Sequence, residues 1–179
     1  MMTGFIFETE RLAVRKFDPE DAERLYAIHC DDEVKKWIPG ECYADVEEAQ
    51  DGIGFFSDCV ENKRLPYVMA VVLKENGELI GDTGVNEVEG KPGEVEIGFV
   101  IGHDYRGKGY ATEAVNLMGE YITSVFPQIN VLYGRVMKGN DASVRVLEKN
   151  GYSFDGEEYG AEDDPYGNGM LIFSCRTGR

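Results

Sequence analysis

The chain has 179 residues, and 18 Lys and Arg against 34 Asp and Glu give it a formal net charge of −16 at pH 7. This length favours a single domain over residues 1–179, and 42% hydrophobic residues suffice for one sizeable core, which excludes disordered, fibrous and collagenous classes. The strong negative charge repels polyphosphate, so duplex nucleic acid and anionic membranes are poor partners.

The sequence also bounds compartment and redox chemistry. No apolar run reaches the ~18 residues of a membrane span, and acidic residues enter at Glu8 and Glu10 before a signal-like block could form. A cytoplasmic protein is therefore expected. The four cysteines and two histidines show neither CxxC nor metal-ligand spacing, so reduced structural thiols and no metal are expected. Monomer and homodimer both stay open.

The hydrophobic patterns predict alternating strands and helices. In chain order, the expected elements are a strand over 10–17, helices from Asp18 and over 45–60, strands over 67–73, 79–85 and 95–101, a helix from Ala111, a strand over 131–137, a helix over 141–149, and strands over 152–155 and 170–175. Nearly continuous apolar character predicts that 95–101 is buried on both faces. The order predicts an α/β (α+β) fold with a mixed sheet of about seven strands, covered by helices on both faces.

Charge is distributed unevenly along this fold. Residues 103–149 carry six basic and five acidic side chains, whereas the remainder carries a net charge of −17. One nearly neutral segment in an acidic protein is where an anionic ligand is expected.

A glycine-rich turn over 102–111 lies between a strand and a helix inside that segment. Gly107 and Gly109 let the backbone approach a ligand, and the free N–H groups of the helix start carry positive charge, so the turn suits phosphate. The Walker pattern fails at Gly109, where a Mg²⁺-binding hydroxyl belongs, and the dinucleotide pattern fails at Thr112, where a third glycine belongs. A phosphate-loop NTPase and a dehydrogenase are disfavoured, while a turn without any ligand stays open.

Four motifs, in order along the chain, resemble the GNAT superfamily of N-acetyltransferases. The turn is similar to its pyrophosphate loop in the run Arg106-x-x-Gly109-x-Ala111, and the preceding strand is similar to its E-x-G-aromatic pattern in Glu96-Ile97-Gly98-Phe99. The later helix and its exit resemble the family in Asn140-Asp141-Ala142-Ser143 and Glu148-Lys149-Asn150-Gly151-Tyr152. The opening resembles the RimJ/RimL-type branch, which acetylates ribosomal-protein N-termini, in Thr9-Glu10-Arg11-Leu12-x-Val14-Arg15.

The resemblance implies a GNAT-like acyl-CoA N-acyltransferase fold whose parallel central strands splay around acetyl-CoA. Backbone N–H groups from Gly107 to Ala111 would hold the pyrophosphate, while the main chain of 99–101 would pair with the pantetheine arm and polarise the acetyl carbonyl. Asn140 is expected to cap helix 141–149 and to contact the cofactor. The predicted cofactor-binding residues are Phe99, Val100, Ile101, Arg106, Gly107, Lys108, Gly109, Tyr110, Ala111, Asn140 and Ser143.

Glu96 is the expected general base. It is an acid within an apolar strand and would face the cleft if Val95 and Ile97 face the core, and burial would then raise its pKa. A surface carboxylate is the alternative interpretation. Glu94, one pleat away on the same face, is the second candidate.

Ser143 is the expected acid. Many family members carry a tyrosine acid seven residues after the asparagine, where this sequence has Leu147. Ser143 matches the position that the RimJ/RimL-type branch is proposed to use to protonate the leaving thiolate. A serine hydroxyl is a weak acid, so the alternatives to full proton transfer are donating a hydrogen bond and relaying a proton through water.

The acceptor side is expected to be acidic. Residues 157–168 contain five acids and no base, which is ordinarily a solvated loop. The functional hypothesis is that this loop and the helices of 18–50 flank the entrance and attract a cationic small amine or a basic peptide N-terminus. The expected function is acetyl-CoA-dependent N-acetyl transfer without metal, by direct attack of the amine, with peptide α-amines ranked slightly ahead. The alternative is a CoA-binding module that has lost transfer.

Overall fold

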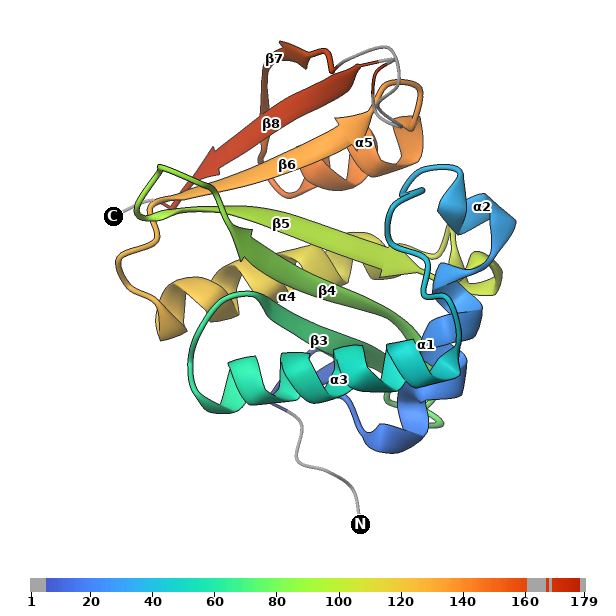
Figure 1. Cartoon of the computed structure of the whole chain (residues 1–179). Helices are drawn as coiled ribbons and strands as arrows, with labels where there is room; N and C mark the ends of the chain where they lie inside the picture. The colour runs from blue at the N-terminus through green and yellow to red at the C-terminus, as the bar shows by residue number, and fades with distance from the viewer. Residues whose placement is uncertain (1–5, 161–166, 168, 178–179) are drawn as a thin grey trace.

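In the part of the chain that the structure describes, eight strands form one mixed sheet in the order β1-β2-β3-β4-β5-β6-β8-β7, with helices on both of its faces (Figure 1). This computed structural model describes residues 6–160, 167 and 169–177. The strands are β1 Phe7–Glu8, β2 Leu12–Arg15, β3 Tyr67–Leu73, β4 Leu79–Glu87, β5 Glu94–Ile101, β6 Val131–Met137, β7 Ser153–Glu158 and β8 Met170–Arg176. β5 and β6 are parallel, and the other neighbours pair antiparallel.

Within the described residues, five α-helices cover the two faces of the sheet. They are α1 Ala22–His29, α2 Asp32–Lys35, α3 Val46–Glu61, α4 Tyr110–Val125 and α5 Asp141–Lys149. In Figure 1, α1 and α3 lie in front of the sheet and α4 lies behind it. The predicted order of long helices and strands is therefore confirmed, and the mixed α/β fold with it.

Two apolar cores hold the layers together. Side chains along a strand alternate between faces, so Met69 and Val71 of β3 pack toward α4, whereas Ala70 and Val72 pack toward α1 and α3. All four are at most 1% exposed. The central strands are thus clamped between helices, which gives the functional residues at their ends a rigid support.

β5 and β6 separate after a short parallel ladder. They pair only as Glu94 with Val131, Val95 with Leu132 and Glu96 with Tyr133, although both strands continue beyond these pairs. On its other side β5 pairs with β4 as far as Ile101. The main chain of β5 after Glu96 therefore has one edge that β6 does not occupy, and its N–H and C=O groups there can pair with a ligand.

Strand 95–101 departs from its expected burial. Val95 and Ile97 are buried, but Glu96 and Phe99 are half-buried and Gly98 is exposed. The expectation of burial on both faces was wrong, because separation from β6 opens one face of the strand. The apolar residues of the run that are buried against α4 include Val95 and Ile97.

The structure also differs from the expected elements at three places near the N-terminus. β1 and α2 were not predicted, because elements of two and four residues carry too few side chains to show a period. Asp18 and Pro19 do not begin an α-helix but a 3₁₀ turn over Pro19–Asp21, from which α1 continues. There the main-chain N–H of Asp18 donates to the Asp21 carboxylate at 2.8 Å. The carboxylate satisfies a donor that a helix start would otherwise leave open.

Candidate active site

The glycine-rich turn leads directly into α4. Gly107 and Gly109 have φ of +74° and +85°, a left-handed backbone that favours glycine. The first helical bond runs from the N–H of Glu113 to the carbonyl of Gly109 at 3.1 Å. The N–H groups over 110–112 therefore have no acceptor within the helix, and the positive end of the helix dipole adds to them. The turn is built to bind an anion.

A cavity of about 410 Å³ lies against this turn. Its lining includes the following predicted cofactor residues: Phe99, Val100, Ile101, Arg106, Gly107, Gly109, Tyr110, Ala111, Asn140 and Ser143. Lys108 is the predicted residue that does not line it, since its ammonium donates to the Asp104 carbonyl at 3.2 Å and lies over the Tyr105 ring. Arg106 also braces the turn, with Nε donating to the Ile101 carbonyl at 3.1 Å.

A second cavity, of about 590 Å³, adjoins the first on the face that α1 and α3 cover. The two share six lining residues, which are Trp37, Ile38, Phe99, Val100, Asn140 and Ser143. They therefore meet where β5 leaves β6. One cavity faces the glycine-rich turn, and the other opens beside Glu96.

Glu96 lines the second cavity, whereas its neighbours Val95 and Ile97 are 2% and 3% exposed in the core against α4. Burial raises the pKa of Glu96, the nearby Arg135 guanidinium at 4.0 Å opposes the rise, and Glu41 and Glu158 add to it. Glu94 lines neither cavity and pairs instead with Lys91 at 3.7 Å. Of the two candidate carboxylates, Glu96 is the one placed to accept a proton in the cavity.

Asn140 and Ser143 lie at the junction of the cavities. Asn140 caps α5, because its Oδ1 accepts the N–H of Ser143 at 3.2 Å, as the sequence predicts. Ser143 is half-buried and lines both cavities. Leu147 is fully buried and packs against Gly134, where an added Cβ would lie 2.5 Å from a Leu147 methyl group. Packing explains the leucine at this position.

A buried His29–Asp82 pair, which was not predicted from the sequence, lines the second cavity. Nε2 of His29 lies 2.7 Å from the Asp82 carboxylate and Nδ1 lies 3.0 Å from the Glu41 carbonyl. Both ring nitrogens face oxygen acceptors, so the geometry favours the doubly protonated imidazolium. Burial alone would lower the pKa of His29, but Asp82 and the hydrogen bond to Glu41 outweigh it and raise the pKa. Asp82 is also an acid inside a mostly apolar strand, the same sequence pattern that indicated Glu96, so this pattern could have pointed to it.

The second cavity carries more acidic than basic side chains. Its carboxylates are Glu41, Glu48, Asp82 and Glu96, and its basic side chains are His29 and Arg135. Burial, and then the charge of Asp82, raise the pKa of Glu41. This charge pattern suits a cationic guest.

The acidic segment 157–168 is only partly within the described residues, which leave out 161–166 and 168 and with them Glu162, Asp163 and Asp164. Glu157 pairs with Lys138 at 3.0 Å and Glu158 with Arg135 at 3.2 Å. Neither glutamate lines the second cavity, so in the described chain its acidity comes from the segment between α2 and α3, from α3, and from β4 and β5.

The sequence over residues 11–153 matches the family described as acetyltransferase (GNAT) domain. The chain belongs to this family. The enzyme is 34% identical to the uncharacterized N-acetyltransferase p20 of Bacillus licheniformis. The match extends over 151 residues and covers 83% of this chain and 82% of the relative. It is an N-acetyltransferase of the GNAT family, and the resemblance that its motifs indicate is confirmed.

Solved structures share the fold of this GNAT enzyme. A GNAT-family acetyltransferase of Bacillus anthracis superposes with a TM-score of 0.75 at 26% identity, covering 94% of this chain and 96% of that one. RimL, a ribosomal α-N-protein acetyltransferase in complex with coenzyme A, superposes with a TM-score of 0.80 at 14% identity, covering 97% and 98%. The splayed mixed sheet is thus the GNAT fold.

Three further observations concern membrane spans, metal sites and cysteines in the described residues. Across residues 6–160, 167 and 169–177, no helix is long and apolar enough to cross a membrane, and no group of three or more His, Cys, Asp or Glu side chains could hold a metal ion. The four cysteines, Cys30, Cys42, Cys59 and Cys175, are free thiols.

Proposed function

We propose that this GNAT enzyme transfers the acetyl group of acetyl-CoA to a primary amine, either a cationic small amine or a peptide N-terminal α-amine. The junction of the two cavities supports this best, because Phe99, Val100 and Ser143 line both while Glu96 lines the second alone. A donor held in the first cavity and an acceptor held in the second would meet at that junction. The CoA complex of RimL, a protein of the same fold, supports CoA as the carrier.

The chain supplies the binding groups for acetyl-CoA at its own main chain. N–H groups of the turn and of the first turn of α4, with Arg106 at the rim, would hold the pyrophosphate. The free edge of β5 after Glu96 would pair with the pantetheine arm as an added strand. An N–H group within Phe99–Ile101 would then donate to the thioester carbonyl, and such donors contribute about 3 kcal/mol to stabilising a developing oxyanion.

Transfer then needs two protons removed from the ammonium nitrogen and one donated to the leaving sulfur. Glu96 takes a proton from the ammonium, directly or through water, and its raised pKa makes it a stronger base. The free amine attacks the thioester carbonyl, a C–N bond forms, the nitrogen gives up its second proton to the leaving sulfur through water, and the C–S bond breaks. Ser143 donates a hydrogen bond to that sulfur, CoA leaves as the thiol, and Glu96 releases its proton to solvent. A thiol with a pKa of ~8.5 is a fair leaving group, so the acid contributes less than the base.

The acidity of the acceptor cavity favours a cationic amine. Glu41, Glu48 and Asp82 lie on different elements around it and leave it net negative together with Glu96. Resemblance of the opening Thr9–Arg15 segment to RimJ/RimL-type enzymes favours a peptide α-amine over a small amine. The proposed acceptor is therefore a peptide N-terminus, with small cationic amines second.

Thiol release from acetyl-CoA across a panel of peptide and small amines tests the proposal. Glu96→Gln should lower kcat with the best amine by about 10²- to 10⁴-fold. The acidic limb of the kcat/KM profile, expected above the ordinary 4.5 because the pKa of Glu96 is raised, should disappear with it. Glu94→Gln is the matched control, since it makes the same change on the same face outside both cavities, and should retain wild-type turnover.

The panel also separates the proposal from its alternative. Unaltered turnover in Glu96→Gln would remove that residue as the base. Tight CoA binding, measured by calorimetry, without turnover of any amine would instead indicate a CoA-binding module.

A further inference from the structure

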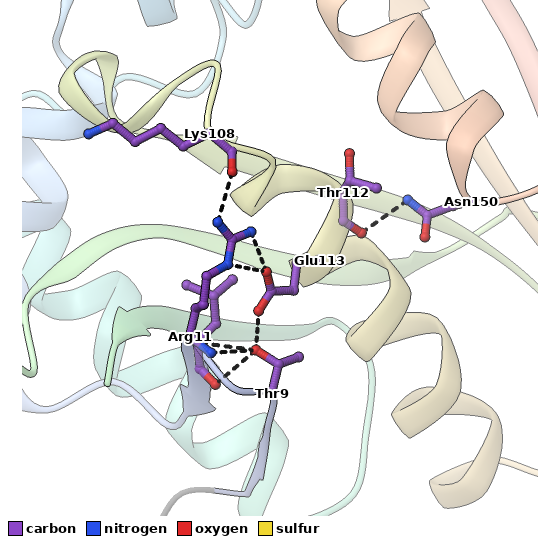
Figure 2. Close-up of polar contacts among 7 residues, drawn as sticks. Thr9, Arg11, Lys108, Thr112, Glu113 and Asn150 are labelled. Carbon is purple, nitrogen blue, oxygen red and sulfur yellow. Dashed lines mark hydrogen bonds and ion pairs between the residues drawn. The ribbon is translucent and has the colours of Figure 1, made fainter. Parts of the chain in front are cut away.

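We propose that Arg11 is a positioning residue that sets the conformation of the phosphate-binding turn, with Glu113 as its anchor. The inference rests on the proposed acetyl-CoA site and concerns the opening motif, which the proposed mechanism leaves unused. Figure 2 shows Arg11 reaching from the N-terminal segment to both the turn and the first turn of α4. In this role Arg11 acts through the turn and does not contact the amine or the thioester.

The three nitrogens and the face of the Arg11 guanidinium all make contacts. Nη1 donates to the carbonyl of Lys108 at 3.0 Å, while Nε and Nη2 donate to one carboxylate oxygen of Glu113 at 3.0 Å and 2.6 Å. The other carboxylate oxygen accepts the hydroxyl of Thr9. The guanidinium also lies 4.7 Å from the centre of the Tyr110 ring. One side chain therefore fixes the turn, the helix start and the N-terminal segment to one another.

The bond to Lys108 controls which way the next N–H points. In a planar trans peptide the C=O and the following N–H point in opposite directions. Because the Lys108 carbonyl faces Arg11, the Gly109 N–H faces away from it, and Gly109 lines the cofactor cavity. An added Cβ on Gly109 would lie 3.5 Å from Nη2 of Arg11, which shows how closely the guanidinium supports the turn.

Stability is a poor explanation for this arrangement. The Arg11 side chain is 47% exposed, and exposed ion pairs contribute little to folding free energy. What the guanidinium provides is direction, since its planar donors reach the carbonyl and the carboxylate together, and a lysine ammonium cannot reproduce this fork. On the opposite side of α4, Nδ2 of Asn150, the residue that caps the end of α5, donates to the Thr112 carbonyl at 3.1 Å and holds the helix start as well (Figure 2).

Two acetyl donors distinguish positioning from general damage. Arg11→Lys keeps the charge and should raise the KM for acetyl-CoA about three- to tenfold at nearly unchanged kcat, because N–H donors to the pyrophosphate become misaligned. S-acetylpantetheine lacks the pyrophosphate, so its kcat/KM should stay within twofold of wild type. CoA affinity measured by calorimetry should fall by the same factor as the acetyl-CoA effect.

Arg64→Lys is the matched control. Arg64 is also half-exposed, pairs with Asp58 and lies 5.6 Å from an aromatic ring centre, that of Phe55, but it lines neither cavity. The control should leave every one of these constants unchanged.

Glu113→Gln tests whether Arg11 acts through its anchor. A positioning role predicts a weaker CoA affinity in this variant too, since Arg11 loses its charged partner. Direct contact of Arg11 with a phosphate predicts the opposite, because removing a carboxylate strengthens the local positive potential, and tighter CoA binding would overturn the proposal. Equal losses with both donors, or unchanged CoA affinity in Arg11→Lys, would also overturn it. CoA calorimetry needs no amine, so a wild type without transfer would refute the proposed function and leave this test intact.

Discussion

Two carboxylates in neighbouring strands point into the same cavity but meet different surroundings. Asp82 of β4 pairs across the ladder with Val100 and Glu96 of β5 pairs with Asn86, which places both acids on the face toward α1 and α3. Asp82 is 8% exposed and is held by His29, whereas Glu96 has a distant cation and more solvent. The first is a structural ion pair, and the second keeps a carboxylate available for a proton.

The His29–Asp82 pair predicts a pH-dependent stability. The folded pKa of His29 is raised above its ordinary 6.5, so the stabilisation is fully present below pH 6.5 and is lost as pH rises through the folded pKa. His29→Ala leaves Asp82 buried without its partner and should cost about 3 kcal/mol in unfolding free energy at pH 6. The cost should shrink at pH 9. Urea unfolding of wild type and variant at both values measures it.

His103→Ala is the control for this prediction, because His103 is exposed at the cofactor turn and is the second of the two histidines. Its stability difference from wild type should be small at both values. A His29→Ala cost that grows with pH would contradict the imidazolium assignment.

At the scale of elements, hydrophobic periodicity and turn-forming residues were enough to predict the turn, α4 and the orientation of β5. The glycines of 107–109 and the apolar spacing of α4 located the turn, and the alternation of Val95, Glu96 and Ile97 oriented the strand. The end of the β5–β6 ladder at Glu96 depends on two strands that are adjacent only in space. His29 and Asp82, 53 positions apart, meet for the same reason, which no local pattern reveals.

The packing of α5 on β6 predicts the outcome of restoring the family's tyrosine. Leu147 has no exposed surface and fills the space above Gly134. Leu147→Tyr adds volume and a hydroxyl to a filled site, so it should lower unfolding free energy by about 1 to 3 kcal/mol without raising kcat.

Leu147→Met is the control for volume, since it keeps an apolar side chain of similar size and should cost less than about 1.5 kcal/mol. Thermal unfolding and thiol release measure the two variants together. A Leu147→Tyr variant that is fully stable and faster than wild type would show that this position is open to an acid after all.

At the scale of the whole molecule, the charge of −16 is divided unevenly along the chain. The segment 103–149, which contributes the turn, α4, β6 and α5, is nearly neutral, whereas the acceptor cavity takes Glu41, Glu48 and Asp82 from the strongly acidic remainder. This division of charge suits the proposed pairing of an anionic donor with a cationic acceptor in one acidic protein. Because the nearly neutral segment and the acidic cavity are separate, we expect salt to affect the binding of acetyl-CoA and of the amine differently.

Glu41→Gln tests this at the mouth of the acceptor cavity. Removing one carboxylate should raise the KM of the best cationic amine about threefold at 50 mM salt and should reduce the rise in that KM between 50 and 500 mM, because less of the attraction remains to be screened. The KM for acetyl-CoA should stay unchanged. Glu23→Gln, which makes the same charge change at an exposed position of α1 outside both cavities, should leave the amine KM and its salt dependence as in wild type. Equal effects of the two variants would show that net charge alone, rather than the cavity, attracts the acceptor.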